Sequence, residues 1–460
     1  MDYAKDPILK DCVSFASASK SLRKDSRSIR NRLNSIAHDS TFVSAVANAF
    51  DLPLVANERC GRWYIPPENI MDSVYFKSTD GHTHQWDFST RRLNLHILDT
   101  IIQFNGVILV DSTRRGKLMP DSLSKTVPIW CTVINRALFS GKLQDDHDAL
   151  KFYTSDLAVS KSETAQISER INRWVERLKS CGADLAELRS KLTKPLRAIW
   201  ITTKSILPQV KPEYEDFYPV VLCTASHMVL DGASRMNGYT YVQGAADDHE
   251  LWAENITPTL FWNNKSALIG ISDDEILDRL KHIVEHQSPS NISDTLDITQ
   301  IGLTDIYVCN RASLVLAVEK DKTFTHIIDV STPPAVTDTT PTITKVLNLP
   351  LQSGKLGSRK LRIYLPQILS FFEGFASASS EEKSCKIIVA CDTGSDFSIG
   401  IVLAILCLNY DDAGRRLTAR NTHRLDKELI RQRFNFISSF KPKVNPSRAT
   451  LQSVNAFLMG

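Results

Sequence analysis

Short apolar runs alternate with helical patterns through the second half of the chain. The stretches Ile306–Cys309, Thr325–Val330 and Lys386–Ala390 have the length of buried strands, and a helical pattern begins near Ile399. Strands that alternate with helices are typical of βα units around a parallel sheet. The pattern therefore predicts an α/β domain with a parallel sheet over residues 298–460.

The first half of the chain has a less regular pattern. Residues 1–50 have a helical periodicity, Ile167–Leu192 predicts one amphipathic helix, and short apolar strands are separated by polar clusters. This order indicates an α+β arrangement. The segment His286–Asp297 contains Pro, Ser and Asn without periodicity, so we expect the domain boundary there. The predicted domains are 1–288, which carries the polar clusters, and 298–460.

Composition narrows the class of protein further. The 460 residues are 42% hydrophobic and 23% charged, with a net charge of +3, as in an ordinary globular protein. Nine cysteines without a C-x-x-C pair indicate reduced thiols in the cytosol or the nucleus. Met1–Leu9 has no signal-peptide pattern, and the longest apolar runs are too short to span a bilayer. We therefore expect a cytoplasmic, soluble protein without a membrane partner.

Six basic residues lie between Lys20 and Arg32, where Asp25 is the one acid. Their spacing of three and four places most of them on one stripe of a helix. Such a stripe suits contact with RNA phosphates, but it is equally typical of a solvated helix face, and both interpretations remain open. The basic residues are Lys20, Arg23, Lys24, Arg27, Arg30 and Arg32.

The most distinctive local motif lies at the end of the third strand of the second half. An apolar strand ends at Cys391, a glycine-containing loop follows, and a helix begins, which is the arrangement of an anion site. It resembles the loop of the dual-specificity phosphatases. However, Phe397 occupies the position of their phosphate-binding arginine, and Ala390 that of their usual histidine, so we predict that phosphatase chemistry is lost. The loop is then either a relic of the fold or a repurposed phosphate contact through Cys391, Gly394, Asp396 and Ser398.

A first polar cluster in the N-terminal half lies between two apolar strands. Small hydroxyl side chains, glycine and lysine in one loop suit phosphate binding, and neighbouring arginines would add charge-assisted hydrogen bonds. His82 and His84 with Cys60 would be an alternative zinc site, although the spacing fits no standard one. The predicted substrate-binding residues here are Lys77, Ser78, Thr79, Asp80, His82, Arg91 and Arg92.

A second cluster follows the apolar strand Gly106–Val110. The strand delivers Asp111 into a loop of hydroxyl and basic side chains, which suits a phosphosugar: the carboxylate would bind ribose hydroxyls or Mg²⁺, and the cations would bind phosphates. The alternative is an exposed basic turn. The predicted substrate-binding residues here are Ser112, Thr113, Arg114, Arg115 and Lys117, with Lys125 and Arg136 further along.

A third cluster places two adjacent carboxylates, Asp247 and Asp248, after the strand that begins at Tyr241. Paired carboxylates suit a Mg²⁺ site or a general base. The alternative is an acidic first turn of a helix, which is common. We expect Asp111, Asp247 and Asp248 to be the catalytic and metal-binding residues.

Several longer runs together resemble one known family. The runs YFKSTDGH, FSTRRLNLHIL, VDSTRRGK, LSKTVPIWCTVINRA, YVQGAADDHELWA and TPTLFW occur in the order found in the initiator-tRNA phosphoribosyltransferases of fungi and plants, and a defective phosphatase-like domain ends the chain in both. The resemblance extends from about residue 10 to the C-terminus.

The resemblance implies a reaction and its partners. The 2′-hydroxyl of adenosine 64 in initiator methionine tRNA would attack C1 of phosphoribosyl pyrophosphate, with Mg²⁺ assisting, and the product would be excluded from elongation. We expect no stable protein partner. The alternative is an RNA-binding pseudophosphatase without catalysis. The acids and hydroxyl loops count against it, because RNA binding alone needs cations.

Overall fold

The computed structural model describes residues 25–460 with short gaps. The gaps are 91, 145–146, 182, 237, 249–251, 254–255, 286–296, 303, 322, 337–344, 353, 382–384, 412–413, 418–419, 422–424 and 442–443. Lys20, Arg23, Lys24, Arg91 and most of the predicted boundary therefore lie outside the described residues. The chain forms two compact units, one of 1–89, 96–179 and 184–288, the other of 90–95, 180–183 and 289–460.

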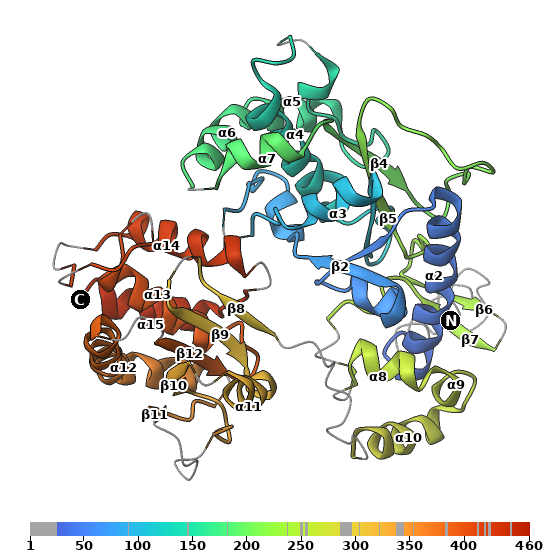
Figure 1. The fold of residues 1–460 in the computed structure, drawn as a ribbon. Coiled ribbons are helices and arrows are strands. Elements are labelled where there is room, and N and C mark those ends of the chain that lie inside the picture. Colours follow the sequence, from blue (N-terminus) through green and yellow to red (C-terminus); the bar gives the residue numbers. More distant parts are fainter. Residues whose placement is uncertain are drawn as a thin grey trace, which may run out of the picture. The chain divides into compact units, whose positions relative to one another are not determined.

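A five-stranded parallel sheet is the centre of the first unit (Figure 1). Every pair of neighbouring strands in it is parallel, so this unit is α/β rather than the α+β arrangement expected from its irregular pattern. The three inner strands are buried, largely apolar runs, which suits a sheet covered on both faces. In sheet order they are β2 (Ile70–Val74), β1 (Leu54–Asn57), β3 (Val107–Asp111), β5 (Tyr218–Thr224) and β4 (Leu196–Ile201).

Helices cover both faces of this sheet. On one face, Ile108, Val110 and Val221 pack against the apolar sides of α2, α8, α9 and α10. The other face is covered by α3 and α4, and α6 and α7 pack on α4. The predicted helix Ile167–Leu192 is divided into shorter helices. Bounds are α2 (Ile29–Phe50), α3 (Ile97–Phe104), α4 (Val127–Phe139), α5 (Lys161–Ser168), α6 (Ile171–Lys179), α7 (Leu185–Lys191), α8 (Pro258–Asn263), α9 (Lys265–Leu268) and α10 (Asp273–Glu285), with the hairpin β6 (Ala233–Met236) and β7 (Tyr239–Val242).

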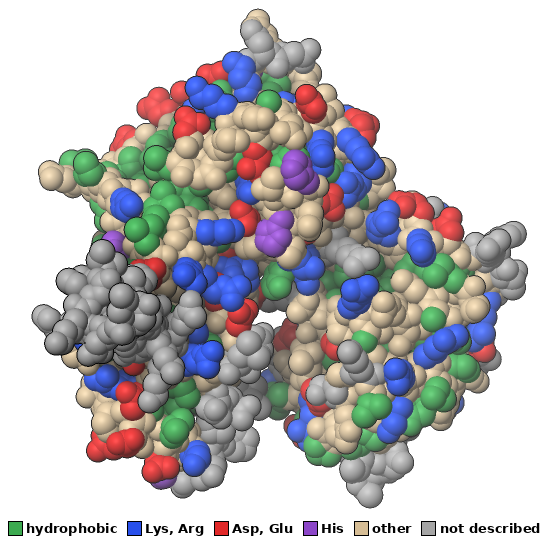
Figure 2. All heavy atoms as spheres, turned by 180° about the vertical axis from the view of Figure 1, so that it is seen from behind, with side chains coloured by type: hydrophobic (Ala, Val, Ile, Leu, Met, Phe, Trp, Pro, Cys, Tyr) green, Lys and Arg blue, Asp and Glu red, His purple; other side chains and the backbone are tan. Residues whose placement is uncertain are grey.

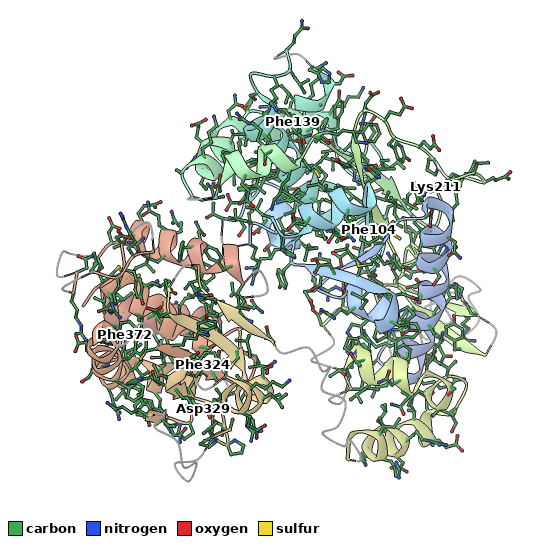
Figure 3. All side chains as sticks on the ribbon, in the orientation of Figure 1. Phe104, Phe139, Lys211, Phe324, Asp329 and Phe372 are labelled. Carbon is green, nitrogen blue, oxygen red and sulfur yellow. The ribbon has the colours of Figure 1, made fainter. Side chains whose placement is uncertain are left out.

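The second unit contains the predicted α/β domain. Its sheet has four parallel strands and one antiparallel edge strand. Phe372, labelled with Phe324 in Figure 3, belongs to the core between the sheet and α12–α15, whereas α11 covers the other face. The elements are β11 (Lys345–Asn348), β10 (Phe324–Asp329), β12 (Lys386–Cys391), β9 (Ile306–Asn310), β8 (Ile298–Gln300), α11 (Arg311–Lys320), α12 (Lys355–Glu381), α13 (Phe397–Asn409), α14 (Lys427–Phe440) and α15 (Arg448–Leu458).

The surface reflects the nearly balanced composition. Figure 2 shows Lys and Arg side chains interspersed with Asp and Glu on the face it presents. Among the described residues, no helix combines the length and the apolar character needed to cross a membrane.

Candidate active site

The carboxyl ends of three neighbouring strands bring polar side chains together in the first unit. Asn57 ends β1, Asp111 ends β3, and Thr224, which pairs in register with Asp111, ends β5. From β1 the chain continues to β2 on one side of the sheet, whereas β3 leads to β5 and β4 on the other. Ligands of open α/β sheets bind at such a reversal, outside the carboxyl ends of the strands.

Asp111 is the centre of this cluster and is fully buried. Its carboxylate accepts hydrogen bonds from Asn57 Nδ2 (2.8 Å), Cys60 Sγ (3.0 Å) and the backbone N of the next residue, Ser112 (2.8 Å). Arg59 donates through Nη2 (2.9 Å) and Nε (3.3 Å), and the Ser122 hydroxyl also donates. A carboxylate with six such donors has its oxygens fully engaged.

Arg59 joins Asp111 to the second predicted carboxylate. Its Nη1 lies 2.9 Å from Asp247 Oδ1, and its Nη2 lies 2.9 Å from Asp111 Oδ1. Burial alone would lower the pKa of Arg59, but its interactions with Asp111, Cys60 and Asp247 together outweigh burial and raise that pKa above its ordinary value. Burial raises the pKa of Asp247, although Arg59 opposes the shift. One guanidinium therefore joins two buried carboxylates in a single network.

These contacts decide how the predicted magnesium ligands fit a metal. Asp111 has no free oxygen lone pair to offer, Asp247 is paired with Arg59, and Asp248 accepts a hydrogen bond from Arg114. Among the residues described, no three His, Cys, Asp or Glu side chains form a metal-binding group, which also counts against zinc at Cys60. The three carboxylates therefore do not fit a Mg²⁺ site as they stand.

The loop after β3 is held by the side chain of Gln243, which directly follows β7. Gln243 accepts from Gly116 N (3.0 Å) and Val229 N (2.8 Å) and donates to Lys117 O (2.7 Å). The next residue, Gly244, has φ +65°, and a Cβ there would lie 2.6 Å from Thr113 O. Only glycine allows this approach.

A cavity of about 390 Å³ opens beside the network. Arg114 reaches it from the loop after β3, where its Nε lies 3.4 Å from Asp247 Oδ2. Arg32 reaches it from α2, with its guanidinium 5.3 Å from the centre of the Trp252 ring. A buried carboxylate among several guanidinium groups suits a ligand that carries phosphates. The lining is Arg27, Ile29, Arg32, Arg114, Asp247, Asp248 and Trp252.

The first and second clusters of the sequence meet around Asp121. Lys117 Nζ lies 2.9 Å, Lys125 Nζ 3.0 Å and His82 Nε2 3.7 Å from its carboxylate. The short helix η4 (Ser78–Gly81) lies against the π-helical turn η5 (Ser122–Thr126), and Thr126 Oγ1 donates to Lys77 O (2.9 Å). The structure thus brings the predicted residues Lys77, Ser78, Thr79, Asp80 and His82 beside the second cluster.

The remaining predicted residues have other surroundings. Ser112 and Thr113 are buried, Arg115 is exposed, and Lys125 is buried in ion pairs with Asp121 and Glu163. Arg136, in the last turn of α4, donates to Leu150 O (2.8 Å) and Asn172 Oδ1 (2.7 Å), so it is not brought to this cluster. Arg92 belongs to the segment grouped with the second unit, where it donates to Asn445 Oδ1 (2.7 Å).

The phosphatase-like loop of the second unit is closed by its own side chains. Cys391 is 2% exposed, and its Sγ lies 3.1 Å from Ser398 Oγ. Asp396 accepts from Ser447 N (2.9 Å), and Phe397, at the arginine position, lies in the core. Gly394 has φ +66° and approaches Asn310 N, where a Cβ would lie 2.7 Å away. The loop contains no cation to bind a phosphate dianion.

Sequence reasoning missed the residues that organise the site. Arg59, Asn57, Asp121 and Gln243 were not among the predicted site residues. One signal was present: Leu54–Asn57 is an apolar run that ends in a polar residue, the pattern that identified Asp111.

The protein is thus a two-unit α/β protein. Its first unit has a site suited to phosphates at the carboxyl edge of a parallel sheet, and its second unit is phosphatase-like. Comparisons with known proteins identify the family. Residues 22–285 match the family model described as the Rit1 N-terminal domain, and 345–458 match the Rit1 DUSP-like domain. The chain is 35% identical over 491 residues to the tRNA A64-2′-O-ribosylphosphate transferase of Saccharomyces cerevisiae, covering 97% of this chain and 95% of that protein.

It is also 36% identical over 457 residues to an uncharacterized protein of Schizosaccharomyces pombe, with 96% of each covered. The chain therefore belongs to the Rit1 family, which confirms the expected family. Solved structures with some likeness include human DUSP28 (TM-score 0.27, 13% identity, 35% of this chain and 93% of that chain) and the Yvh1 phosphatase domain from Chaetomium thermophilum (TM-score 0.28, 15% identity, 35% and 94%). The DUSP-like character of the second unit follows from the family model.

Proposed function

We propose that this chain is a transferase that attaches a ribosyl phosphate group to the 2′-oxygen of adenosine 64 in a tRNA. The observation that carries the proposal is the 35% identity, along 97% of the chain, to a tRNA A64-2′-O-ribosylphosphate transferase. The donor in this proposal is phosphoribosyl pyrophosphate, and the acceptor is cytosolic initiator methionine tRNA.

The reaction breaks the bond between C1 of the ribose and the pyrophosphate oxygen and forms a bond from C1 to the 2′-oxygen. The 2′-hydroxyl proton passes to a base, and the electron pair of the broken bond leaves with pyrophosphate. Negative charge therefore grows on the leaving group, where preorganised cations stabilise the transition state. Arg114 and Arg32 in the cavity, with Lys117 in the same loop as Arg114, are the cations suited to that task.

Asp247 is the residue best suited to accept the proton. It lines the cavity, is 5% exposed, and has a pKa raised by burial. A base with a raised pKa accepts a proton more readily near neutral pH. Asp111, by contrast, is the residue that positions Arg59, because all its oxygen lone pairs are engaged by the protein. Magnesium remains a prediction from the pyrophosphate chemistry, and no step here depends on it.

The test uses the purified chain with phosphoribosyl pyrophosphate labelled in its 5-phosphate and with unmodified initiator or elongator methionine tRNA. We expect label in the initiator tRNA alone. Asp247→Asn should lower the rate by about 10²- to 10⁴-fold, which is the contribution of a general base. The matched control, Asp156→Asn on the exposed surface, should leave it unchanged. Tight tRNA binding without any label would instead favour the RNA-binding pseudophosphatase.

A further inference from the structure

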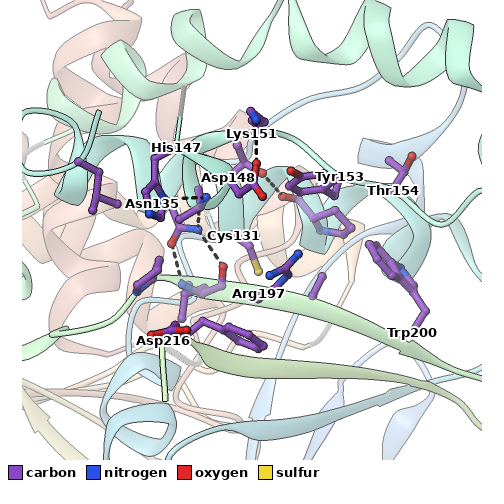
Figure 4. Close-up of a pocket in the computed structure, with 18 residues that line it drawn as sticks. Cys131, Asn135, His147, Asp148, Lys151, Tyr153, Thr154, Arg197, Trp200 and Asp216 are labelled. Atoms are coloured by element: carbon purple, nitrogen blue, oxygen red, sulfur yellow. Dashed lines mark hydrogen bonds and ion pairs between the residues drawn. The ribbon is translucent and has the colours of Figure 1, made fainter. Parts of the chain in front are cut away.

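A second cavity of the first unit lies apart from the network around Asp111. It has a volume of about 620 Å³ and lies between α4 and the edge strand β4, closed at one side by the short helix η6 (Asp148–Leu150). Figure 4 shows Arg197 near the middle of it, with Asp148 and Tyr153 above and Asp216 below. The volume is typical of small-ligand sites.

Planar side chains dominate its lining. The guanidinium of Arg197 lies 5.2 Å from the centre of the Phe217 ring and 5.9 Å from that of Tyr153, and Trp200 lines the wall beside it. Tyr153 is 43% exposed, and Phe217 is half-buried, so ring surface remains open to a ligand. Aromatic rings and arginine planes are the surfaces on which proteins stack unpaired bases.

Charge excludes a phosphate as the main occupant. The cations Arg197 and Lys151 are balanced by the carboxylates of Asp148 and Asp216, and Lys151 Nζ already lies 2.7 Å from Asp148 Oδ1. A site for a phosphate dianion has an excess of cations, as the smaller cavity has. An uncharged planar group with polar edges suits this lining better, because it stacks on the rings and forms hydrogen bonds with the acids and the lysine.

The cavity is connected to the candidate active site through one short segment. Trp200, in the cavity wall, donates from Nε1 to Leu123 O (3.0 Å). Leu123 belongs to the π-helical turn η5, whose Ser122 donates to Asp111. Turns of this type are frequent at functional sites. A ligand that holds Trp200 in place therefore also supports the position of Asp111.

We propose that this cavity binds an unpaired nucleobase of the RNA substrate. The inference rests on the proposed function, because it takes RNA as the substrate, and it adds a contact outside the site of transfer. The base stacks with Arg197 and the Tyr153 ring. Recognition of a base that a regular duplex does not expose gives the protein a means of selecting one RNA among many with similar helices.

The first experiment measures binding of unmodified initiator tRNA to the full chain by fluorescence anisotropy. Tyr153→Ala should weaken binding about tenfold, within the range measured for stacked bases, whereas Tyr153→Phe, which keeps the ring, should bind as the unaltered chain does. Arg197→Lys keeps the charge but not the plane, so it should also weaken binding. Arg173→Lys, at an exposed arginine on α6, is the matched control for losing a guanidinium plane outside the cavity.

Ultraviolet cross-linking gives an independent measurement. Irradiation of the complex should attach a nucleotide to a peptide containing Tyr153, Trp200 or Phe217, and mass spectrometry identifies the peptide. Unchanged affinity of Tyr153→Ala, with adducts only on other peptides, would overturn the inference. Equal binding of Arg197→Lys and the unaltered chain would show that charge rather than stacking acts there, which also overturns it.

The outcomes separate this inference from the proposed function. If the chain binds and labels the tRNA while the cavity variants behave normally, only the base-binding inference fails. If the unaltered chain neither binds nor labels tRNA, the proposed function fails first.

Discussion

At the scale of single residues, the first unit gives different surroundings to two carboxylates that had the same predicted role. Asp111 is fully buried and accepts six hydrogen bonds, whereas Asp248 is half-exposed and bound only by Arg114 among the contacts described. Removing charge from a buried, paired group leaves its partner unpaired in the interior, but an exposed pair contributes little to stability. The two residues should therefore respond differently to the same substitution.

We predict that Asp111→Asn lowers the free energy of unfolding by about 1–3 kcal/mol, because the amide nitrogen that replaces one carboxylate oxygen cannot accept the hydrogen bonds that buried donors make to it. Asp248→Asn should change it by less than about 1 kcal/mol, since asparagine also tolerates the φ of +51° at that position. Urea unfolding of both variants is the measurement. Similar losses in the two variants would contradict this assignment.

His326 gives the second unit a dependence on pH. Its side chain is 3% exposed, Nε2 has no partner among the described residues, and burial lowers the pKa to about 4. The folded protein therefore favours the neutral imidazole. Below pH 6.5 the unfolded chain binds a proton that the folded chain does not, so the free energy of unfolding decreases as the pH falls toward 4. We predict a loss of about 2–3 kcal/mol over that range.

The check is thermal unfolding of the full chain at pH 7 and at pH 5. His326→Leu, which cannot be protonated, should lose less stability between the two values than the unaltered chain does. His282, at the end of α10 in the first unit, is the position for a matched control substitution. An equal pH dependence in His326→Leu would count against the assignment to this side chain.

At the scale of elements, the strand β7 acts on the loop that follows β3. Gln243 directly follows β7, is 3% exposed, and forms hydrogen bonds to the backbone of Gly116, Lys117 and Val229. Its side chain thereby fixes the backbone that carries Arg114 and Lys117. A positioning role of this kind should appear in binding of the donor more than in the chemical step.

We predict that Gln243→Ala raises the KM for phosphoribosyl pyrophosphate about tenfold with a smaller change in kcat. Because the amide of Val229 loses its acceptor and that of Gly116 keeps only Val229 O, their hydrogen exchange should become faster, which mass spectrometry detects. Exchange that stays slow at both amides would contradict the positioning role, whatever the kinetics.

The elements also show how far a sequence can be interpreted. The strands at 306–310, 324–329 and 386–391 match the predicted runs within a residue or two, because each is an apolar run bounded by polar turns. The sheet order and the role of Asp111 were not predictable, since Arg59 meets Asp111 only after β1 and β3 pair. Arg136 was likewise predicted to bind substrate together with the Asp111 cluster, because it follows that cluster in the sequence. However, Arg136 lies in the last turn of α4 and donates to Leu150 O, away from the carboxyl edge of the sheet.

At the scale of the whole molecule, the second unit has the architecture of a phosphatase domain without the groups for its chemistry. Cys391 is buried beside Ser398, and Phe397 packs in the core where a cation would be needed. The loop is therefore part of the fold rather than a second active site.

We predict that Cys391→Ser leaves the tRNA transfer activity unchanged, because no step of the proposed reaction uses this thiol. The chain should not hydrolyse p-nitrophenyl phosphate, which serves as the control assay for phosphatase chemistry. Hydrolysis that disappears in Cys391→Ser would refute the interpretation of this loop.

Both sheets share one topological feature, which bears on how the chain acquires its structure. In each, the last strand in the sequence occupies an inner position: β5 lies between β3 and β4, and β12 lies between β10 and β9. During synthesis on the ribosome, β4 and β9 therefore emerge before the strand that joins each of them to its sheet. Non-local pairing of this kind slows folding. A chain that stops before residue 218 or before residue 386 would expose unpaired strand edges, which are sites of aggregation.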